Sequence, residues 1–279
     1  MPFTKMHGLG NDFIVVESAD LAARLTPADW QRLSDRHRGI GFDQALVIEP
    51  ARDAGTSAFY RIFNADGHEV EQCGNGARCI AAYLHQRMTV PGGLLRMACP
   101  GGLVGARITG AGRVAVDMGV PDFSASASHF DEAGQTGPHF SIDLGSQTVS
   151  CGVVSMGNPH AVLRVTDVDA APVADVGPRL ESHPRFRQRV NVGFMQVVNP
   201  GHIRLRVYER GAGETQACGT GACAAVAVGR RAGWLGDTVQ VDLPGGRLEI
   251  RWRGPGEMLW MEGPAEVSFE GWVEIAGEE

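Results

Sequence analysis

The chain has 279 residues, 43% of them hydrophobic, which is enough for one large or two medium domains with buried cores. Its net charge of −7, without a basic run, argues against nucleic acid as the main partner, because phosphates call for a clustered lysine and arginine surface. No stretch approaches the ~18 apolar residues of a membrane span, and the first residues lack the apolar core of a signal peptide. We therefore expect a cytoplasmic protein with no membrane partner.

The cysteines and the single lysine limit which metal sites and cofactors the protein could use. The six cysteines show neither the C-x-x-C spacing of zinc and thioredoxin-like sites nor the density of a disulfide scaffold, so we expect free thiols and no metal site. Lysine occurs once, as Lys5, whereas a pyridoxal cofactor needs a dedicated lysine for its Schiff base. The sequence therefore favours chemistry without a cofactor. The cysteines stand at positions 73, 79, 99, 151, 218 and 223.

Hydrophobic periodicity and turn residues predict alternating strands and helices in the first half of the chain. The expected elements are a strand, turn and strand over 3–17 with Asn11 at the turn, a helix from Thr26 to Gly39, a strand with Gln44, a strand over 57–64 that ends in Asn64, a helix that follows Cys73 and ends near Met88, and a hairpin over 100–119. The strand, loop and helix around the cysteine place its thiol at a helix N-terminus.

The second half predicts a similar order. The expected elements are a crossing between domains over 120–146, a strand, turn and strand over 149–165 with Asn158 and His160 at the turn, a short helix over 175–183, a strand over 190–198 with Asn191, a strand over 203–210, a helix over 221–230 after Cys218, a hairpin over 244–263 and a last strand over 266–275. The helix over 221–230 is apolar all round, so protein should enclose it on every side, as a sheet curled around it would do.

The two halves also match residue by residue. Residues 61–77 fall on residues 206–222 after a shift of 145 positions, which superimposes Cys73 on Cys218 within a C-G-x-G frame. Self-similarity at a fixed offset indicates an internal duplication. Further pairs at near-equal shifts are Asn11 with Asn158, Gln44 with Asn191, Asn64 with Glu209 and 100–102 with 244–246. We therefore expect an α/β (α+β) fold of two pseudo-symmetric domains, with a site that receives one cysteine from each.

Two matched thiols suit one reaction especially well. A cysteine is more often a small core residue than a nucleophile, but no packing rule requires both copies to keep C-G-x-G at a helix start. A thiolate can remove a proton from one face of a carbon while a thiol delivers one to the other face, which inverts the stereocentre. The helix N-termini can bind an α-carboxylate, and we expect the helix start at Cys73 to lower the pKa of that thiol. Five of the six asparagines lie in matched stretches, where their amides could hold a polar ligand.

The chain resembles the diaminopimelate epimerases of lysine and peptidoglycan precursor biosynthesis. The resemblance spans essentially the whole chain and rests on blocks in the family's order, namely KMHGLGNDF, the 41–44 stretch, NADG, CGNGARC, GNPH, ERGAGET and ACGTGACA. It implies a pyridoxal-independent epimerase that interconverts LL- and meso-2,6-diaminopimelate. It also implies two domains, 1–117 plus 264–279 and 118–263, each a curled, mostly antiparallel sheet around a central helix, with the active site in the cleft between them and a homodimer as the usual state.

The same resemblance implies a role for each motif residue. Cys73 and Cys218 would be the two acid/base groups, and His160 and Glu209 would tune the thiols. Substrate contacts would come from Asn11, Gln44, Asn64, Gly74, Asn75, Asn158, Asn191, Glu209, Arg210, Gly219 and Thr220. The residues themselves allow Arg210 to pair bidentately with a carboxylate and Glu209 to take an ammonium group, although a solvated surface pair is the simpler reading of these two.

Three other functions are compatible with paired cysteines. A two-cysteine racemase of proline or hydroxyproline would share the C-G-x-G frames, but a cyclic secondary amine has no use for so many distal amides. A thiol redox protein would cycle the two cysteines through a disulfide, against which the lack of C-x-x-C speaks. A non-catalytic amino-acid-binding protein would need no matched thiols. Comparison of substrates, dependence on the disulfide state and proton exchange at the bound ligand separate these readings.

Overall fold

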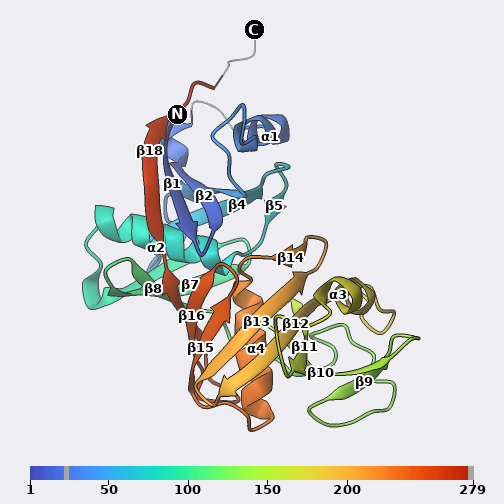
Figure 1. Ribbon diagram of the computed structural model, residues 1–279. Coiled ribbons are helices and arrows are strands. Elements are labelled where there is room, and N and C mark those ends of the chain that lie inside the picture. Colours follow the sequence, from blue (N-terminus) through green and yellow to red (C-terminus); the bar gives the residue numbers. More distant parts are fainter. Residues whose placement is uncertain (22–24, 276–279) are drawn as a thin grey trace. The chain divides into compact units, whose positions relative to one another are not determined.

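The computed structural model describes residues 1–21 and 25–275, which form two compact units. The first unit comprises residues 1–116 and 263–279 and the second comprises residues 117–262. The last four residues of the stretch 264–279 lie outside the described residues. Both units combine strands with few helices, so the expected two-domain α+β fold is confirmed (Figure 1).

The first unit folds its strands around the helix that follows Cys73. In Figure 1 the red strand β18 returns beside the blue strand β1, with which it pairs antiparallel. The unit contains β1 (Pro2–Gly8), β2 (Asn11–Glu17), β3 (Gln44–Glu49), β4 (Ala58–Asn64), β5 (Glu69–Val70), β6 (Leu94–Cys99), β7 (Gly102–Gly110), β8 (Arg113–Asp117) and β18 (Glu266–Trp272), the helices α1 (Pro27–Ser34) and α2 (Gly74–Arg87), and 3-10 helices over Ser18–Asp20 and Pro91–Gly93. Helix α2 contacts β1, β2, β3 and β7, which makes it the central helix of the unit.

The second unit repeats this plan. Its helix α4 contacts β10, β11, β12, β13 and β16 and is buried along nearly its whole length, as its all-round apolar sequence predicts. The unit contains β9 (Phe140–Asp143), β10 (Thr148–Ser155), β11 (Pro159–Val165), β12 (Asn191–Asn199), β13 (His202–Glu209), β14 (Gly213–Thr215), β15 (Thr238–Leu243), β16 (Gly246–Arg251) and β17 (Trp260–Pro264), and the helices α3 (Val173–Glu181) and α4 (Gly219–Arg231).

The pairing of the strands is the same at equivalent positions of the two units, as the duplication in the sequence predicts. In the first unit β2 pairs parallel with β3 so that Phe13 lies opposite Gln44, and in the second β11 pairs parallel with β12 so that His160 lies opposite Asn191. A side-chain pair is repeated as well: Arg61 Nε donates to Glu69 Oε1 at 2.6 Å, and 145 positions later Arg206 Nε donates to Glu214 Oε1 at 2.6 Å. The sheets are mixed, because β4 with β6 and β13 with β15 are also parallel.

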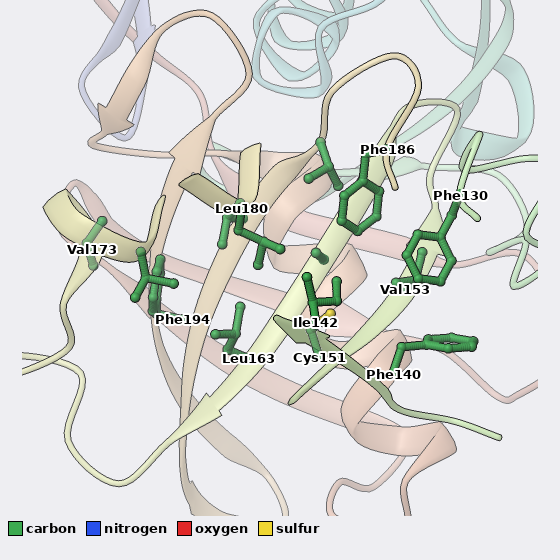
Figure 2. Packing of buried hydrophobic residues seen from close by; sticks show 14 residues of the cluster. Phe130, Phe140, Ile142, Cys151, Val153, Leu163, Val173, Leu180, Phe186 and Phe194 are labelled. Carbon is green, nitrogen blue, oxygen red and sulfur yellow. The ribbon is translucent and has the colours of Figure 1, made fainter. Parts of the chain in front are cut away.

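A second core of the second unit lies between its sheet and α3. Figure 2 shows Val173 and Leu180 of α3 with Phe194 of β12 in this cluster, and Phe130 against Phe186. The rings of Phe130 and Phe186 are stacked, with centroids 4.8 Å apart. Burial of such side chains contributes roughly 1.5–3 kcal/mol each. The cluster fixes α3 against the strand that begins at Asn191.

Two expectations from the sequence are wrong in detail. The helix that begins after Thr26 ends at Ser34, not at Gly39, where a Cβ would lie 2.3 Å from the carbonyl oxygen of Arg32. Residues 120–146 are no crossing, because they belong to the second unit, in which β9 pairs with β10.

The alternating apolar residues over 266–275 divide into two pairs, and only Val273 and Ile275 are partly buried, against a core of the first unit. Val267 is 42% exposed and Phe269 is 50% exposed, although the ring of Phe269 packs edge-on against Phe3. Exposed apolar strands are common at subunit interfaces, but the expected homodimer stays a prediction. Among the described residues, none of the helices combines the length and the hydropathy that crossing a membrane would require.

Candidate active site

Cys73 begins the central helix of the first unit. It is the N-cap of α2, with extended backbone dihedrals, and its Sγ accepts a hydrogen bond from the backbone N–H of Gly76 at 3.4 Å. The first intrahelical bond runs from the N–H of Ala77 to the carbonyl oxygen of Cys73 at 2.8 Å. Gly74 and Asn75 therefore lie in the first turn, where N–H groups and the helix dipole favour an anion. The thiol is partly exposed.

Asn11 connects this thiol to the turn between β1 and β2. Its Oδ1 lies 3.9 Å from Sγ of Cys73 and accepts a hydrogen bond from Nδ2 of Asn75 at 3.2 Å. Its Nδ2 donates to Oδ2 of Asp43 at 3.0 Å, and Arg36 holds the other oxygen of Asp43 at 2.8 Å. Because a carboxylate accepts and does not donate, Asp43 fixes the amide orientation, with the oxygen of Asn11 toward the thiol.

Gln44 and Asn64 form a second polar pair in the first unit. They are opposite each other on β3 and β4, and Nε2 of Gln44 donates to Oδ1 of Asn64 at 2.9 Å. Gln44 follows Asp43 directly, so this pair starts from the same loop that orients Asn11. The Oε1 atom of Gln44 is buried and has no hydrogen-bond partner within residues 1–21 and 25–275, which leaves an acceptor available for a ligand donor.

Cys218 repeats the geometry of Cys73 in the second unit, but in a more enclosed place. It is the N-cap of α4, its Sγ accepts from the N–H of Gly221 at 3.3 Å, and Oγ1 of Thr220 lies 3.6 Å away. The residue is 4% exposed. Burial raises the pKa of this thiol well above its usual range and the negative charge of Glu209 raises it further, while the hydrogen bonds from Thr220 and Gly221 act in the opposite direction. At Cys218, burial therefore outweighs the effect of the helix N-terminus on the thiol pKa.

A chain of polar contacts leads from Thr220 to His160. Nδ2 of Asn158 lies 3.4 Å from Oγ1 of Thr220, and Oδ1 of Asn158 lies 2.9 Å from Nε2 of His160. Burial lowers the pKa of His160 to about 3, with a smaller contribution from the charge of Arg210. The ring is therefore neutral, and His160 reaches Cys218 only through two intervening side chains.

Neutral His160 predicts a pH-dependent stability. The ordinary histidine pKa in the unfolded chain is about 6.5, so between about pH 6.5 and 3 the unfolded state binds a proton that the folded state does not. Stability should fall as the pH falls through this window, with a slope of up to about 1.4 kcal/mol per pH unit. His160→Gln should flatten the curve measured by urea denaturation, whereas His85→Gln, at an exposed histidine of α2, should not. Equal slopes for His160→Gln and the unaltered protein would contradict the assignment.

Asn191, Glu209 and Arg210 come together where β12 begins and β13 ends. Oδ1 of Asn191 accepts from the backbone N–H of Arg210 at 3.0 Å, and its Nδ2 donates to the carbonyl oxygen of Pro159 at 3.0 Å. Glu209 accepts a hydrogen bond from the hydroxyl of Thr215. Arg210 donates from its guanidinium to the carbonyl oxygen of Gln188 at 3.0 Å, and within residues 1–21 and 25–275 it forms no ion pair. Arg210 is exposed, and Glu209 and Arg210 are not joined by an ion pair in the described part of the chain.

The residues predicted from the sequence thus form two groups, one in each unit. The first group is Asn11, Gln44, Asn64, Cys73, Gly74 and Asn75, and the second is Asn158, His160, Asn191, Glu209, Arg210, Cys218, Gly219 and Thr220. Sequence reasoning missed Asp43 and Glu181, which hold members of these groups in place. Asp43 stands directly before Gln44, a position that could have drawn attention, whereas no pattern marks Glu181.

A family model described as diaminopimelate epimerase matches residues 3–124 and 152–268. Among solved structures, a probable proline racemase from Agrobacterium radiobacter is similar at 16% identity, over 99% of this chain and 93% of its own, with a TM-score of 0.71. A hydroxyproline epimerase from Agrobacterium vitis is similar at 14% identity, over 97% and 91%, with a TM-score of 0.67. A predicted epimerase from Pseudomonas aeruginosa is similar at 17% identity, over 99% of both chains, with a TM-score of 0.68.

These structural likenesses establish the fold, and the family model adds the sequence blocks around both cysteines. The matched segments cover well over half of the chain and include Cys73 and Cys218. The chain belongs to the diaminopimelate epimerase family.

Proposed function

We propose that this protein interconverts LL- and meso-2,6-diaminopimelate without a cofactor, with Cys73 and Cys218 as the two acid/base groups. The observation that carries the proposal is the repeated thiol geometry. Each unit places a cysteine as the N-cap of its central helix, where the sulfur accepts the N–H of Gly76 or Gly221. Two such thiols, on opposite faces of one α-carbon, can exchange its configuration.

The proposed reaction moves two protons and no other atoms. One cysteine thiolate takes the α-proton, so the C–H bond breaks, an S–H bond forms, and the electron pair remains on the α-carbon and its carboxylate. The thiol of the other cysteine then gives its proton to the opposite face and becomes a thiolate. The raised pKa of the Cys218 thiol suits the role of proton donor, because burial keeps this thiol protonated.

The groups around each thiol suit the charges of an amino acid. Helix N-termini at Gly74 and Gly219 would bind the α-carboxylate and stabilise the negative charge that develops as the proton leaves. Glu209 would accept the ammonium group. The distal amino-acid head would be held by Arg210, whose guanidinium has no carboxylate partner among the described residues, and by Asn64, Asn158 and Asn191.

A substrate with two α-amino-acid groups accounts for this number of polar side chains better than a substrate with one. A cyclic secondary amine such as proline carries one carboxylate and one nitrogen, so it would leave the arginine and several of the amides without a ligand partner. A site that hydrogen-bonds a polar group of its substrate discriminates against an analogue that lacks this group. Diaminopimelate is therefore proposed as the substrate in preference to proline or hydroxyproline.

The test is incubation of one diaminopimelate isomer with the purified protein in deuterated water, without pyridoxal phosphate or metal. We expect the epimer and α-deuterium to appear together, because the incoming proton comes from a thiol that has exchanged with solvent. Chiral chromatography gives the epimer and mass spectrometry gives the label. Proline and trans-4-hydroxyproline serve as comparison substrates. Turnover of either one with diaminopimelate left untouched would replace the proposal, and label without any epimer would indicate binding with one-sided exchange.

A further inference from the structure

Glu181 is a buried carboxylate that the proposed reaction does not use. It is the last residue of α3 and is 2% exposed. A negative charge at a helix C-terminus is unfavourable to the helix dipole, and a charge removed from water is costly unless it is fully paired. Such a residue needs specific partners, and the structure supplies them.

The two oxygens of Glu181 bind two different segments. Oε1 accepts the backbone N–H of Gly211 at 2.9 Å, and Oε2 accepts from the guanidinium of Arg189 at 2.6 Å. The backbone of Glu181 takes part too, since its carbonyl oxygen accepts from the N–H of Val190 at 3.0 Å. One side chain thus joins the turn after β13 to the loop before β12.

Arg210 lies between these two attachment points. The next residue, Gly211, is held by Glu181, and the residue before Arg189, Gln188, offers its carbonyl oxygen to the guanidinium of Arg210 at 3.0 Å. The backbone N–H of Arg210 is bound by Asn191, also at 3.0 Å. The position of the arginine head therefore depends on both segments that Glu181 connects.

Helix α3 is itself firmly held, so Glu181 can act as a fixed anchor. Leu180, next to Glu181, is fully buried in the cluster of Figure 2. Gly177, one turn earlier, allows the ring of Tyr208 to approach the helix, because a Cβ there would lie 2.7 Å from the ring. Tyr208 directly precedes Glu209, so the helix packs against the strand end that carries the proposed ligand residues.

The first unit fastens the equivalent turn in a weaker way. Ser34 occupies the position matched to Glu181 after a shift of 147 residues, and its hydroxyl donates to the carbonyl oxygen of Ala65 at 3.1 Å. That turn follows Asn64, which carries an amide in place of the charged pair Glu209 and Arg210. A charged anchor therefore stands in the half whose turn carries charged ligand residues.

We propose that Glu181, paired with Arg189, is a positioning residue that sets the placement of Arg210 and Glu209, and through Arg210 the selectivity for a second carboxylate. The inference rests on the proposed function for the ligand that Arg210 binds, although the anchoring itself does not. Glu181 touches no reacting atom in this scheme. It holds the turn 209–213 in the conformation in which the guanidinium is presented.

The test compares Glu181→Gln with Asp175→Asn on the same helix. Asp175 is a matched control because it is also a carboxylate beside an arginine, Arg179, at 3.4 Å, but it is exposed and, among the described residues, makes no hydrogen bond to the turn 209–213. Glu181→Gln removes the charge that Arg189 and Gly211 share. We expect a loss of roughly tenfold in kcat/KM for diaminopimelate, mostly through a higher KM, and no change for Asp175→Asn.

A double-mutant cycle separates positioning from general destabilisation. In an Arg210→Lys background, Glu181→Gln should cost little more, because the group that it positions is already altered. An equal loss in both backgrounds would overturn the proposal. Should Glu181→Gln fail to fold, Arg189→Gln removes the same ion pair at a side chain that is 55% exposed and should give the same coupling.

Hydrogen exchange tests the anchoring independently of activity. Glu181→Gln should speed amide exchange at residues 209–213 and leave the amides of α4 unchanged, whereas Asp175→Asn should leave both unchanged. Unchanged exchange at 209–213 would refute the anchor even in an active enzyme. Altered exchange in a protein whose unaltered form does not epimerise diaminopimelate would instead refute the proposed function and leave the anchor standing.

Discussion

Cys73→Ala and Cys218→Ala are each expected to lower epimerisation by roughly 10²–10⁴-fold, the usual contribution of a positioned acid or base. Inversion needs a proton acceptor on one face of the α-carbon and a donor on the other, so neither thiol can replace the other. Both cysteines are N-caps whose sulfur accepts one backbone N–H. Steady-state turnover of each isomer, measured by chiral chromatography, gives the effect in both directions.

Loss of fold is the main alternative explanation for such an effect. The circular dichroism spectra of both variants should therefore match that of the unaltered protein. Their free energies of unfolding should differ from its value by no more than the cost of one cap hydrogen bond, about 1 kcal/mol. Cys79→Ala is a suitable control, because Cys79 is fully buried and its pKa is raised to about 12, which keeps it from acting as a base. Near-normal turnover by either catalytic-cysteine variant would rule out the two-base mechanism.

Arg210→Lys should lower kcat/KM for diaminopimelate by roughly tenfold to a hundredfold, although the charge is conserved. A guanidinium offers a planar fork that a carboxylate can accept with both oxygens, whereas an ammonium is a point charge with a different reach. Losing one charge-assisted hydrogen bond costs about 1.5–3 kcal/mol. The guanidinium also donates to the carbonyl oxygen of Gln188, which a lysine would not reach with the same geometry.

The substrate dependence of this variant decides what Arg210 binds. If the fork binds the non-reacting carboxylate, the loss should be large for diaminopimelate and small for an analogue without that group. Kinetic constants for both compounds with both proteins are the measurement. Normal kinetics on diaminopimelate would mean that the distal head is held by the asparagines without Arg210.

Much of the fold was predictable because local signals and the duplication agree. Thr26 and Asp29 form the reciprocal hydrogen bonds of a capping box, so the start of α1 follows from its sequence. The C-G-x-G frames predicted both central helices, and the matched positions 44 and 191 lie opposite residues 13 and 160 in the same parallel register. A pattern that occurs twice in one chain is far less ambiguous than a pattern that occurs once.

The rest depended on contacts between segments that are distant in the sequence. Phe130 and Phe140 occur in a stretch rich in serine, glycine and proline, and only the packing of Phe130 against Phe140 and Phe186 shows that this stretch is part of a core. The pKa of Cys218 likewise depends on how fully the neighbouring residues bury it, which a helix N-terminus alone does not reveal. Glu181 gained its partners from a loop and a turn that no local pattern connects to α3.

Lys5 is the only lysine of the sequence and its side chain is buried, so the surface offers almost no ε-amines to chemical reagents. The residue is 7% exposed. Its ammonium group lies 2.6 Å from the carboxylate of Asp12 and also donates to the carbonyl oxygen of Gly41. Arginine accounts for every other cation among the 25 lysine and arginine residues. Cross-linkers and dyes that couple to ε-amines therefore have no exposed lysine to attack, and a lysine-specific protease has one cleavage site, inside a paired strand.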